Sequence, residues 1–363
     1  MIKIKNFIQF LFKDKKEKKF IFYSEDKRYF NYFSEFIDIL SKNHKVIYVT
    51  SDLSETKRNL NNVEILFIGK GIIRRLFFLT LECKFFFITL SDLGNHELKK
   101  SKNCEKYVYI FHSPLSTHVI YKENAFDNYD YICCNGDYQF EEISIREEKY
   151  KLKKKNKIKA GYLYLDYLNS KLNRNIKQKR KILFAPTWID SKNSLFELKS
   201  LEIIEKFLKN DFSVIFRPHI EHYKRSRNKI SEIAKQFKTN NNFEINNSSN
   251  DFRYLEQSEM LVTDYSGIAI EYLFCLKRPV LYLDDYKKIH NKNFHMLDLP
   301  TFENEVREKF GFVINSLSLD DFLNEHEKKI NEFYANRNQL EKFIHQKFYN
   351  VGKVAENLYK SLI

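Results

Sequence analysis

The sequence is poor in the residues that break regular structure. Glycine and proline number only 8 and 5 among 363 residues, which excludes a low-complexity or loop-dominated chain. Since both are scarce, each is expected where the backbone needs it. Four of the five prolines fit this expectation, because they stand at the boundaries of apolar runs: Pro114, Pro186, Pro218 and Pro279.

The sequence also lacks a cysteine framework. Its 5 cysteines are odd in number and follow no metal-binding spacing, which argues against a set of disulfides or a zinc site. Most of them lie inside apolar runs, so we expect buried thiols in a reducing compartment. These residues are Cys83, Cys104, Cys133, Cys134 and Cys275.

No apolar run approaches the roughly 20 residues that a membrane span requires. The start of the chain has lysines but no small-residue cleavage site, so no signal peptide is expected and the chain is predicted to be cytoplasmic. Within residues 1–19, apolar residues follow helical spacing between lysines. This pattern fits either a helix on an anionic membrane surface, at the inner face of the membrane, or a packed first helix. The residues concerned are Ile4, Phe7, Ile8, Leu11 and Phe12.

The charge is strongly basic, with a net +14. Such a surface attracts nucleic acid, anionic lipid or phosphorylated small molecules, although a lysine-rich genome would have the same effect. Zinc-finger spacing and an aromatic RNA-binding signature are both missing, so no nucleic-acid partner is expected.

Short apolar runs alternate with amphipathic segments, which favours parallel α/β sheets. The expected strands cover 20–24, 45–50, 64–69, 84–90, 107–112, 129–134, 181–186, 212–218, 259–264 and 278–284. A basic segment at 169–181 is the predicted linker, and the tail from about residue 318 is expected to be helical.

This organisation predicts two Rossmann-like domains that face a cleft, with a C-terminal helix crossing back, which is the GT-B architecture. The expected domains cover 1–170 and 171–340, although alternation alone would fit many doubly wound proteins and the fold name rests partly on the motifs below. Residues 341–363 would pack back on the first domain.

A polar cluster follows the expected strand that ends near Phe111. His112 comes first, and a histidine near its ordinary pKa can accept a proton from an attacking hydroxyl. The alternative is a histidine that only caps the strand. Ser113, Ser116 and His118 add further polar groups in the same turn.

Two cationic groups flank a proline after a later strand. Arg217 can bind phosphate oxygens, and a protonated His219 can stabilise a departing phosphate. His222, three residues further on, is expected to be solvated.

The segment from Leu261 to Phe274 places Asp264 at a strand end and Ser266 and Gly267 at a helix start. Helix N-termini favour a pyrophosphate, although a plain helix cap explains the same residues. Glu271, one turn further, would reach a ribose.

Just past another strand, Thr187 and Trp188 could line the nucleotide site, with core packing as the alternative for the tryptophan. Asp284 and Asp285 could indicate a metal site, but a turn after a strand explains them as well. No metal and no other cofactor is expected to be required.

Taken in order, these motifs resemble the CDP-glycerol glycerophosphotransferase family, which includes teichoic-acid primases and polymerases. The resemblance spans about residues 20–314 and is strongest in APTW (185–188), RPH (217–219) and TDYSG through Glu271 to RPVLY. A less characterised branch is closer still in YSE (23–25), FHS…STH…IY (111–121) and AFDNYD (125–130).

The resemblance implies a GT-B fold with the acceptor on the N-terminal half and CDP-glycerol on the C-terminal half. It implies that His112 is the base and that Arg217, His219, Ser266 and Gly267 bind the donor diphosphate. It also places Ser113, Ser116 and His118 on the acceptor side.

The resulting hypothesis is transfer of glycerol phosphate, or a related polyol phosphate, from a CDP-linked donor to a hydroxyl of a surface glycan or lipid-linked acceptor. Two alternatives remain open at this point. One is a glycosyltransferase that uses a CMP- or UDP-sugar in capsule or lipopolysaccharide synthesis. The other is a non-catalytic glycan-binding member of an assembly complex.

Overall fold

The computed structural model describes residues 2–363 except 92, 96–97, 177, 190 and 248–250. Met1 of the predicted surface helix and Lys177 of the predicted linker therefore lie outside the described residues. The chain divides into two compact units. The first contains 1–167, 290–299 and 345–363, and the second contains 168–289 and 300–344.

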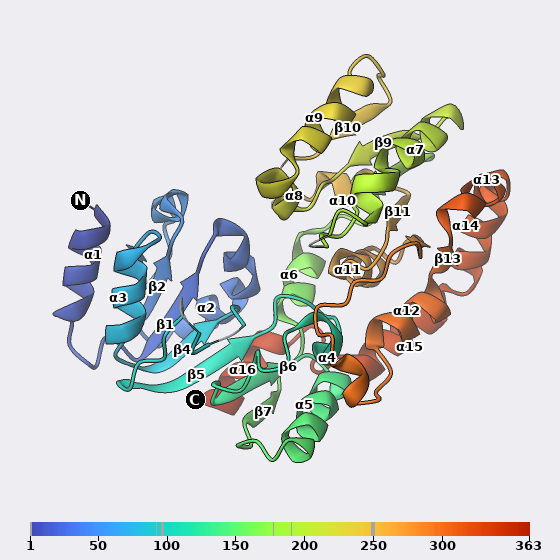
Figure 1. Cartoon of the computed structure of the whole chain (residues 1–363). Helices are drawn as coiled ribbons and strands as arrows, with labels where there is room; N and C mark the ends of the chain where they lie inside the picture. The colour runs from blue at the N-terminus through green and yellow to red at the C-terminus, as the bar shows by residue number, and fades with distance from the viewer. Residues whose placement is uncertain (1, 92, 96–97, 177, 190, 248–250) are drawn as a thin grey trace. The chain divides into compact units, whose positions relative to one another are not determined.

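The first unit is built on a parallel sheet of 7 strands in the order β3-β2-β1-β4-β5-β6-β7 (Figure 1). Strands β1 and β2 are buried along their whole length, as expected when helices cover both faces of a parallel sheet. The strands are β1 (Phe20–Ser24), β2 (Val46–Thr50), β3 (Val63–Phe67), β4 (Cys83–Ile88), β5 (Cys104–Ile110), β6 (Tyr131–Cys134) and β7 (Asn156–Lys159).

Helices and short 3-10 turns connect these strands or complete the unit. They are α1 (Ile2–Leu11), η1 (Lys27–Tyr32), α2 (Ser34–Ser41), η2 (Leu53–Lys57), α3 (Ile72–Thr80), α4 (Thr117–Ile120), α5 (Asp137–Lys149), η3 (Phe294–Met296) and α16 (Val354–Leu362). Two further helices, α6 (Leu163–Lys171) and α15 (Arg337–Lys347), contain residues of both units.

The second unit repeats the plan with 6 parallel strands in the order β10-β9-β8-β11-β12-β13. The strands are β8 (Lys181–Phe184), β9 (Ser213–Phe216), β10 (Phe243–Ile245), β11 (Met260–Thr263), β12 (Val280–Leu283) and β13 (Phe312–Ile314). The helical segments are α7 (Leu195–Lys209), α8 (Ile220–Arg225), α9 (Arg227–Gln236), α10 (Arg253–Gln257), α11 (Gly267–Leu276), α12 (Phe302–Phe310), η4 (Ser316–Ser318), α13 (Leu319–Asn324) and α14 (His326–Ala335).

Local sequence explains how individual helices begin and end. Before α7, the Ser194 hydroxyl accepts a hydrogen bond from the Glu197 backbone N–H, which satisfies one exposed donor of the first turn. Glu197 lies in that first turn, whereas Lys206 and Lys209 lie in the last, and both placements complement the helix dipole.

The end of the chain returns to the first unit, where α16 packs against α2. The Asp166 carboxylate accepts hydrogen bonds from the backbone N–H groups of Gly352, at 2.8 Å, and Val354, at 3.0 Å. Gly136 and Gly161 make the close approach possible. A Cβ on Gly136 would lie 1.8 Å from the Lys347 carbonyl oxygen, and one on Gly161 would lie 2.2 Å from that of Tyr349.

All five cysteines lie among the described residues; they are buried and form no disulfide, as expected for structural thiols. Throughout the residues that the structure describes, no helix is long and apolar enough to cross a bilayer.

Candidate active site

In the second unit, the predicted donor residues gather at one edge of the sheet. Thr187, Arg217 and Asp264 follow β8, β9 and β11, which are neighbouring parallel strands. Because the carboxyl ends of parallel strands meet at the same edge, their loops converge. Direct hydrogen bonds join them: the Arg217 N–H donates to the Phe184 carbonyl at 2.8 Å, and the Thr187 N–H donates to Asp264 Oδ1 at 2.7 Å.

Asp264 is fully buried at this edge. Its Oδ1 accepts from Thr187, whereas Oδ2 has no hydrogen-bond partner among the described residues. Burial raises the pKa of the carboxyl to about 6. The side chain therefore fixes the Thr187 loop while keeping an unused acceptor atom.

Two basic residues that the sequence analysis did not identify complete this edge. Lys288 Nζ donates to Thr187 Oγ1 at 3.3 Å, and burial lowers the pKa of this amine. Arg307 donates to the Asp264 main-chain oxygen at 2.9 Å and to Asp284 Oδ1 at 2.6 Å. These contacts fix the loop between β11 and α11.

Asp284 and Asp285 have different partners. The Tyr265 hydroxyl donates to Asp284 at 2.7 Å, and the Ser316 hydroxyl donates to Asp285 at 2.6 Å. Within the described chain, no group of three or more His, Cys, Asp or Glu side chains could hold a metal ion.

Arg217 is half-buried, and its Nη1 atom is shielded from solvent with no hydrogen-bond partner in the described parts of the chain. A buried guanidinium N–H without an acceptor carries a free-energy penalty that a bound anion would remove. The geometry thus gives Arg217 the properties of an anion-binding residue.

His219 is exposed and caps the N-terminus of α8. Its Nδ1 accepts a hydrogen bond from the Glu221 N–H at 3.2 Å, so Nδ1 carries no proton in this conformation. The neutral ring then has its proton on Nε2, from which it can donate a hydrogen bond.

His222 corrects the sequence analysis, because it is buried instead of solvated. Its ring stacks on Phe196 with centroids 3.6 Å apart. Burial lowers its pKa to about 4, and its Nδ1 accepts from the His219 backbone N–H. It is thus a neutral residue that supports the cap.

At the start of α11, Ser266 is the N-cap by its extended backbone, but its side chain makes no capping hydrogen bond. Gly267 begins the helix, and Glu271 lies half-buried one turn later. Trp188 is also half-buried, and the Arg225 guanidinium lies 5.4 Å from the centre of its ring. Simple core packing therefore does not explain the tryptophan.

In the first unit, His112 follows β5 and is half-buried. Its Nδ1 lies 2.9 Å from the Thr89 carbonyl oxygen. Since a carbonyl oxygen only accepts, Nδ1 is the donor, and the neutral ring has its lone pair on Nε2. This tautomer is the one that a general base needs.

The other predicted acceptor-side residues differ in exposure. Ser113 is half-buried, and its hydroxyl accepts a 3.4 Å hydrogen bond from the Leu115 N–H. Ser116 and His118 are buried in the interior of the unit. His118 lies 3.3 Å from Glu142 Oε1 through Nδ1 and 3.2 Å from the Leu299 carbonyl oxygen through Nε2.

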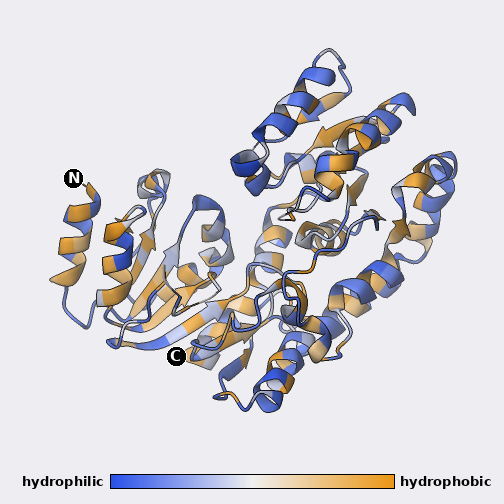
Figure 2. Cartoon of the chain, viewed as in Figure 1, coloured by the Kyte–Doolittle hydropathy of each residue, from blue (hydrophilic) through white to orange (hydrophobic). Residues whose placement is uncertain are grey.

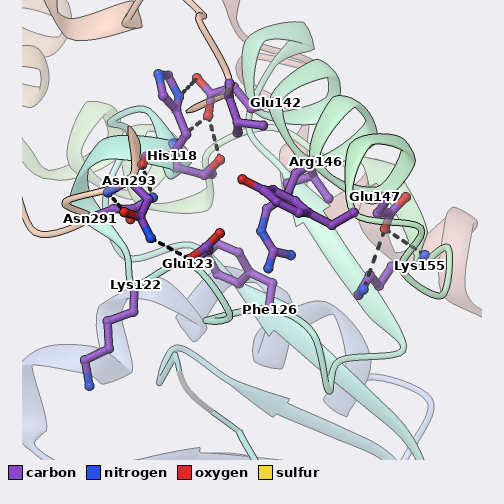
Figure 3. A pocket seen from close by; sticks show the side chains of 14 residues that line it. His118, Lys122, Glu123, Phe126, Glu142, Arg146, Glu147, Lys155, Asn291 and Asn293 are labelled. Carbon is purple, nitrogen blue, oxygen red and sulfur yellow. Dashed lines mark hydrogen bonds and ion pairs between the residues drawn. The ribbon is translucent and has the colours of Figure 1, made fainter. Parts of the chain in front are cut away.

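A small pocket lies beside His118, lined by polar residues of α4, α5 and the 290–299 segment (Figure 3). Hydrogen bonds hold that segment in the first unit: the Asn291 side chain donates to the His118 carbonyl, and the Asn293 side chain donates to Glu123. The contacts therefore make His118 an anchor for residues 290–299.

Similar folds occur among solved structures. A variant of the wall teichoic acid polymerase TagF with CDPG superposes with a TM-score of 0.60 and 17% identity, covering 99% of this chain and 92% of that one. The UDP-GlcNAc 2-epimerase from Neisseria meningitidis superposes with a TM-score of 0.59 and 13% identity, covering 95% of this chain and 98% of that one. The UDP-GlcNAc 2-epimerase from Methanocaldococcus jannaschii superposes with a TM-score of 0.53 and 13% identity, covering 95% of this chain and 98% of that one.

Two Rossmann-like parallel-sheet domains of this kind define a GT-B protein. No protein with a curated description matches the chain significantly. Residues 6–360 match the family described as CDP-Glycerol:Poly(glycerophosphate) glycerophosphotransferase. The chain belongs to this family and is a glycerophosphotransferase-like enzyme, which confirms the resemblance seen in the sequence.

Proposed function

We propose that the enzyme transfers glycerol phosphate, or a related polyol phosphate, from a CDP-linked donor to a hydroxyl of a surface glycan or lipid-linked acceptor. The observation that carries the proposal is the shielded, unpartnered Nη1 of Arg217 at an edge that also holds His219 and the start of α11. A diphosphate would satisfy all of these donors.

In the proposed reaction, His112 Nε2 accepts the proton of the acceptor hydroxyl. The hydroxyl oxygen bonds to the distal phosphorus of the donor, and the bond from that phosphorus to the bridging oxygen breaks. Arg217 and the Nε2–H of His219 stabilise the charge on the departing CMP. Ser266 and Gly267 would contact the diphosphate, whereas Thr187 and Glu271 would contact the rest of the nucleotide.

Product analysis tests the reaction class. The protein is incubated in parallel with CDP-glycerol, a CMP-sugar and a UDP-sugar, and the products are examined by mass spectrometry. We expect a phosphorus-containing product from CDP-glycerol. A glycosyl product without phosphorus would establish sugar transfer instead, and no donor consumption at all would favour a non-catalytic binding protein.

Substitutions test the roles of the two histidines. His112→Ala and His219→Ala should each lower kcat by about 100-fold or more, since general-base and charge-stabilising groups have effects of this size. The matched control is His345→Ala, because His345 is exposed on α15. Near-normal turnover of both variants, with native circular dichroism, would refute the assignment.

We also propose that the enzyme works at the inner, cytoplasmic face of a membrane. Helices α1 and α3 lie side by side (Figure 1), and both are rich in apolar residues (Figure 2). Several of these large apolar side chains are exposed. Phe12, directly after α1, is 86% exposed, and Ile72 at the start of α3 is 73% exposed. Lys5 and Arg75 are exposed on the same helices and would attract anionic headgroups.

Vesicle flotation tests this surface. Removing residues 1–19 would also remove Phe10, which is buried with its ring centre 4.9 Å from that of Phe77, so a deletion would damage the core. Ile8→Glu combined with Ile72→Glu changes exposed positions only. We expect this double variant to lose flotation with phosphatidylglycerol vesicles, and unchanged flotation would contradict the proposal.

A further inference from the structure

Lys288 lies in the loop after β12, at the same edge of the second sheet as the proposed donor residues. The strands β9, β8, β11 and β12 are neighbours in this order, and all of them are parallel. Adjacent strands lie about 4.8 Å apart, so the loops after them converge. The residues that follow these strands are, in the same order, Arg217, Thr187, Asp264 and Lys288. Lys288 therefore belongs to the donor edge by topology as well as by its contact with Thr187.

The Lys288 ammonium group is incompletely satisfied. It has three N–H donors, but within the described residues its one hydrogen-bond acceptor is Thr187 Oγ1, at 3.3 Å. No carboxylate in the described part of the chain forms an ion pair with it, and Asp264 and Glu303 act on it only through electrostatic attraction at longer range. The side chain is half-buried, and burial lowers the pKa of the amine. An anion at this position would remove the free-energy cost of the unpaired ammonium.

Arg307 is the contrasting case at the same edge. Its guanidinium donates to the Asp264 main-chain oxygen and to the Asp284 carboxylate. The charge of Arg307 is thus balanced within the protein, as expected for a cation with a structural role. Lys288 and Arg217, by contrast, have no carboxylate partner among the residues that the structure describes. Their two positive charges are left for a ligand.

Two unbalanced cations at one edge fit a ligand with two phosphates. In a nucleotide that is linked through a diphosphate, each phosphate carries one negative charge, whereas a CMP-sugar has a single phosphate and a single charge. Hydrogen bonds from a cation to phosphate are stronger than those between neutral groups. Arg217 and His219 are proposed to bind the phosphate that departs with CMP. The distal phosphate of the donor is therefore the one that remains for Lys288.

We propose that the Lys288 ammonium binds the distal phosphate of the donor and neutralises the phosphoryl group while it moves to the acceptor hydroxyl. The inference deepens the proposed function, on whose donor site it rests. The bonds that form and break are those of the proposed reaction, and Lys288 keeps its protons throughout. Lysine suits this role because its compact charge and rotatable donors can follow oxygens that change position during transfer. Lys288 would then make the site prefer a diphosphate-linked donor to a CMP-linked one.

Binding of CDP and CMP tests the assignment without any transfer. Isothermal titration calorimetry is run on the full chain with each nucleotide, and with UDP and UMP in parallel so that the result does not depend on the base. We expect the unchanged protein to bind the diphosphate about 10-fold more tightly than the monophosphate or better. Lys288→Met, which keeps the apolar stem, should weaken diphosphate binding by about 10-fold or more and change monophosphate binding by less than about 2-fold.

The matched control is Lys287→Met, because Lys287 is the preceding residue and is exposed. This variant should bind both nucleotides as the unchanged protein does. Lys288→Arg keeps the positive charge and should retain most of the preference for the diphosphate. If circular dichroism shows that Lys288→Met does not fold, Lys288→Gln decides, because it removes the charge but keeps a polar group beside Thr187.

Two results would overturn the assignment. Equal losses of monophosphate and diphosphate affinity in Lys288→Met would mean that Lys288 only supports the Thr187 loop. Unchanged affinity for both nucleotides would mean that Lys288 does not contact the donor at all.

Kinetics then separate this inference from the proposed reaction. With CDP-glycerol as donor, Lys288→Met should lower kcat for CMP release by about 10-fold or more, since the charge of the phosphoryl group would no longer be neutralised. A loss of the diphosphate preference in Lys288→Met, when even the unchanged protein releases no CMP from CDP-glycerol, would sink the proposed reaction and leave the phosphate site standing. Binding of none of the four nucleotides would overturn both.

Discussion

The Asp264 carboxyl group is completely buried. Because burial changes its pKa on folding, the free energy of unfolding of the protein depends on pH. Burial raises its pKa from 3.8 to about 6. Between these values the unfolded chain is ionised while the folded protein stays protonated, so this group lowers stability progressively as the pH rises from about 4 to about 6.

We therefore expect Asp264→Asn, which keeps an acceptor for the Thr187 N–H but cannot ionise, to remove this dependence. Relative to the unchanged protein, its free energy of unfolding should rise by up to about 3 kcal/mol between pH 4 and pH 7. Denaturant unfolding at the two pH values measures the change. Parallel pH profiles of the two proteins would show that Asp264 is not the titrating group.

Arg217 should contribute to donor affinity through its shielded guanidinium. Arg217→Ala is expected to weaken CMP binding by about 10- to 100-fold, since a hydrogen bond to a charged group is worth about 1.5–3 kcal/mol. Isothermal titration calorimetry measures the affinity, with Arg227→Ala as control because Arg227 is exposed on α9. Equal losses in both variants would point to general electrostatics instead of a specific contact.

Much of the candidate site could be predicted from sequence motifs, because a polar residue directly after an apolar run marks the end of a strand. Thr187, Arg217 and Asp264 were found in this way. Lys288 and Arg307 were not, since they reach the same edge from loops and helices 24 and 43 residues beyond Asp264, and no local pattern encodes such a contact.

At the scale of elements, Gly136 and Gly161 are two positions at which an added Cβ would collide with the backbone of the returning C-terminal segment. Gly161→Ala would bring a methyl group 2.2 Å from a carbonyl oxygen at a φ of +100°. We expect the free energy of unfolding to fall by ~2 kcal/mol or more because of overpacking, which would lower the Tm by roughly 4–8 °C.

The control for this effect is Gly352→Ala. Gly352 also has a positive φ, +82°, but among the described residues no atom beyond its two chain neighbours lies within 4 Å of an added Cβ. The free energy of unfolding of Gly352→Ala should fall by only about 1 kcal/mol, because alanine disfavours the positive φ. Equal losses in the two variants would mean that the close approach is not the cause.

The strands that could not be predicted from the sequence are β7, β10 and β13, and each is an outermost strand of its sheet. Edge strands cover less apolar surface, so their sequences need no continuous apolar run. The residues of β10 are all half-buried, and β7 alternates lysine with other residues. The central strands, by contrast, were recognisable because both of their faces are buried.

At the scale of the whole molecule, Trp188 reports on one unit only, since it is the single tryptophan and belongs to the second unit. CMP at 100 times its Kd should stabilise the protein by about 2.7 kcal/mol. We expect the unfolding midpoint followed by Trp188 fluorescence to rise by roughly 5–10 °C. A fluorescence midpoint that does not move, while circular dichroism shows stabilisation, would place the nucleotide on the first unit.

The return of residues 345–363 to the first unit has a consequence for synthesis on the ribosome. Asn135, Gly136, Gly161 and Asp166 leave the exit tunnel early, yet the backbone that they contact, from Lys347 to Val354, is translated nearly two hundred residues later. This face of the N-terminal unit therefore stays uncovered until residues 347–354 have been translated, and the folding of this unit is completed only after the other unit has been made.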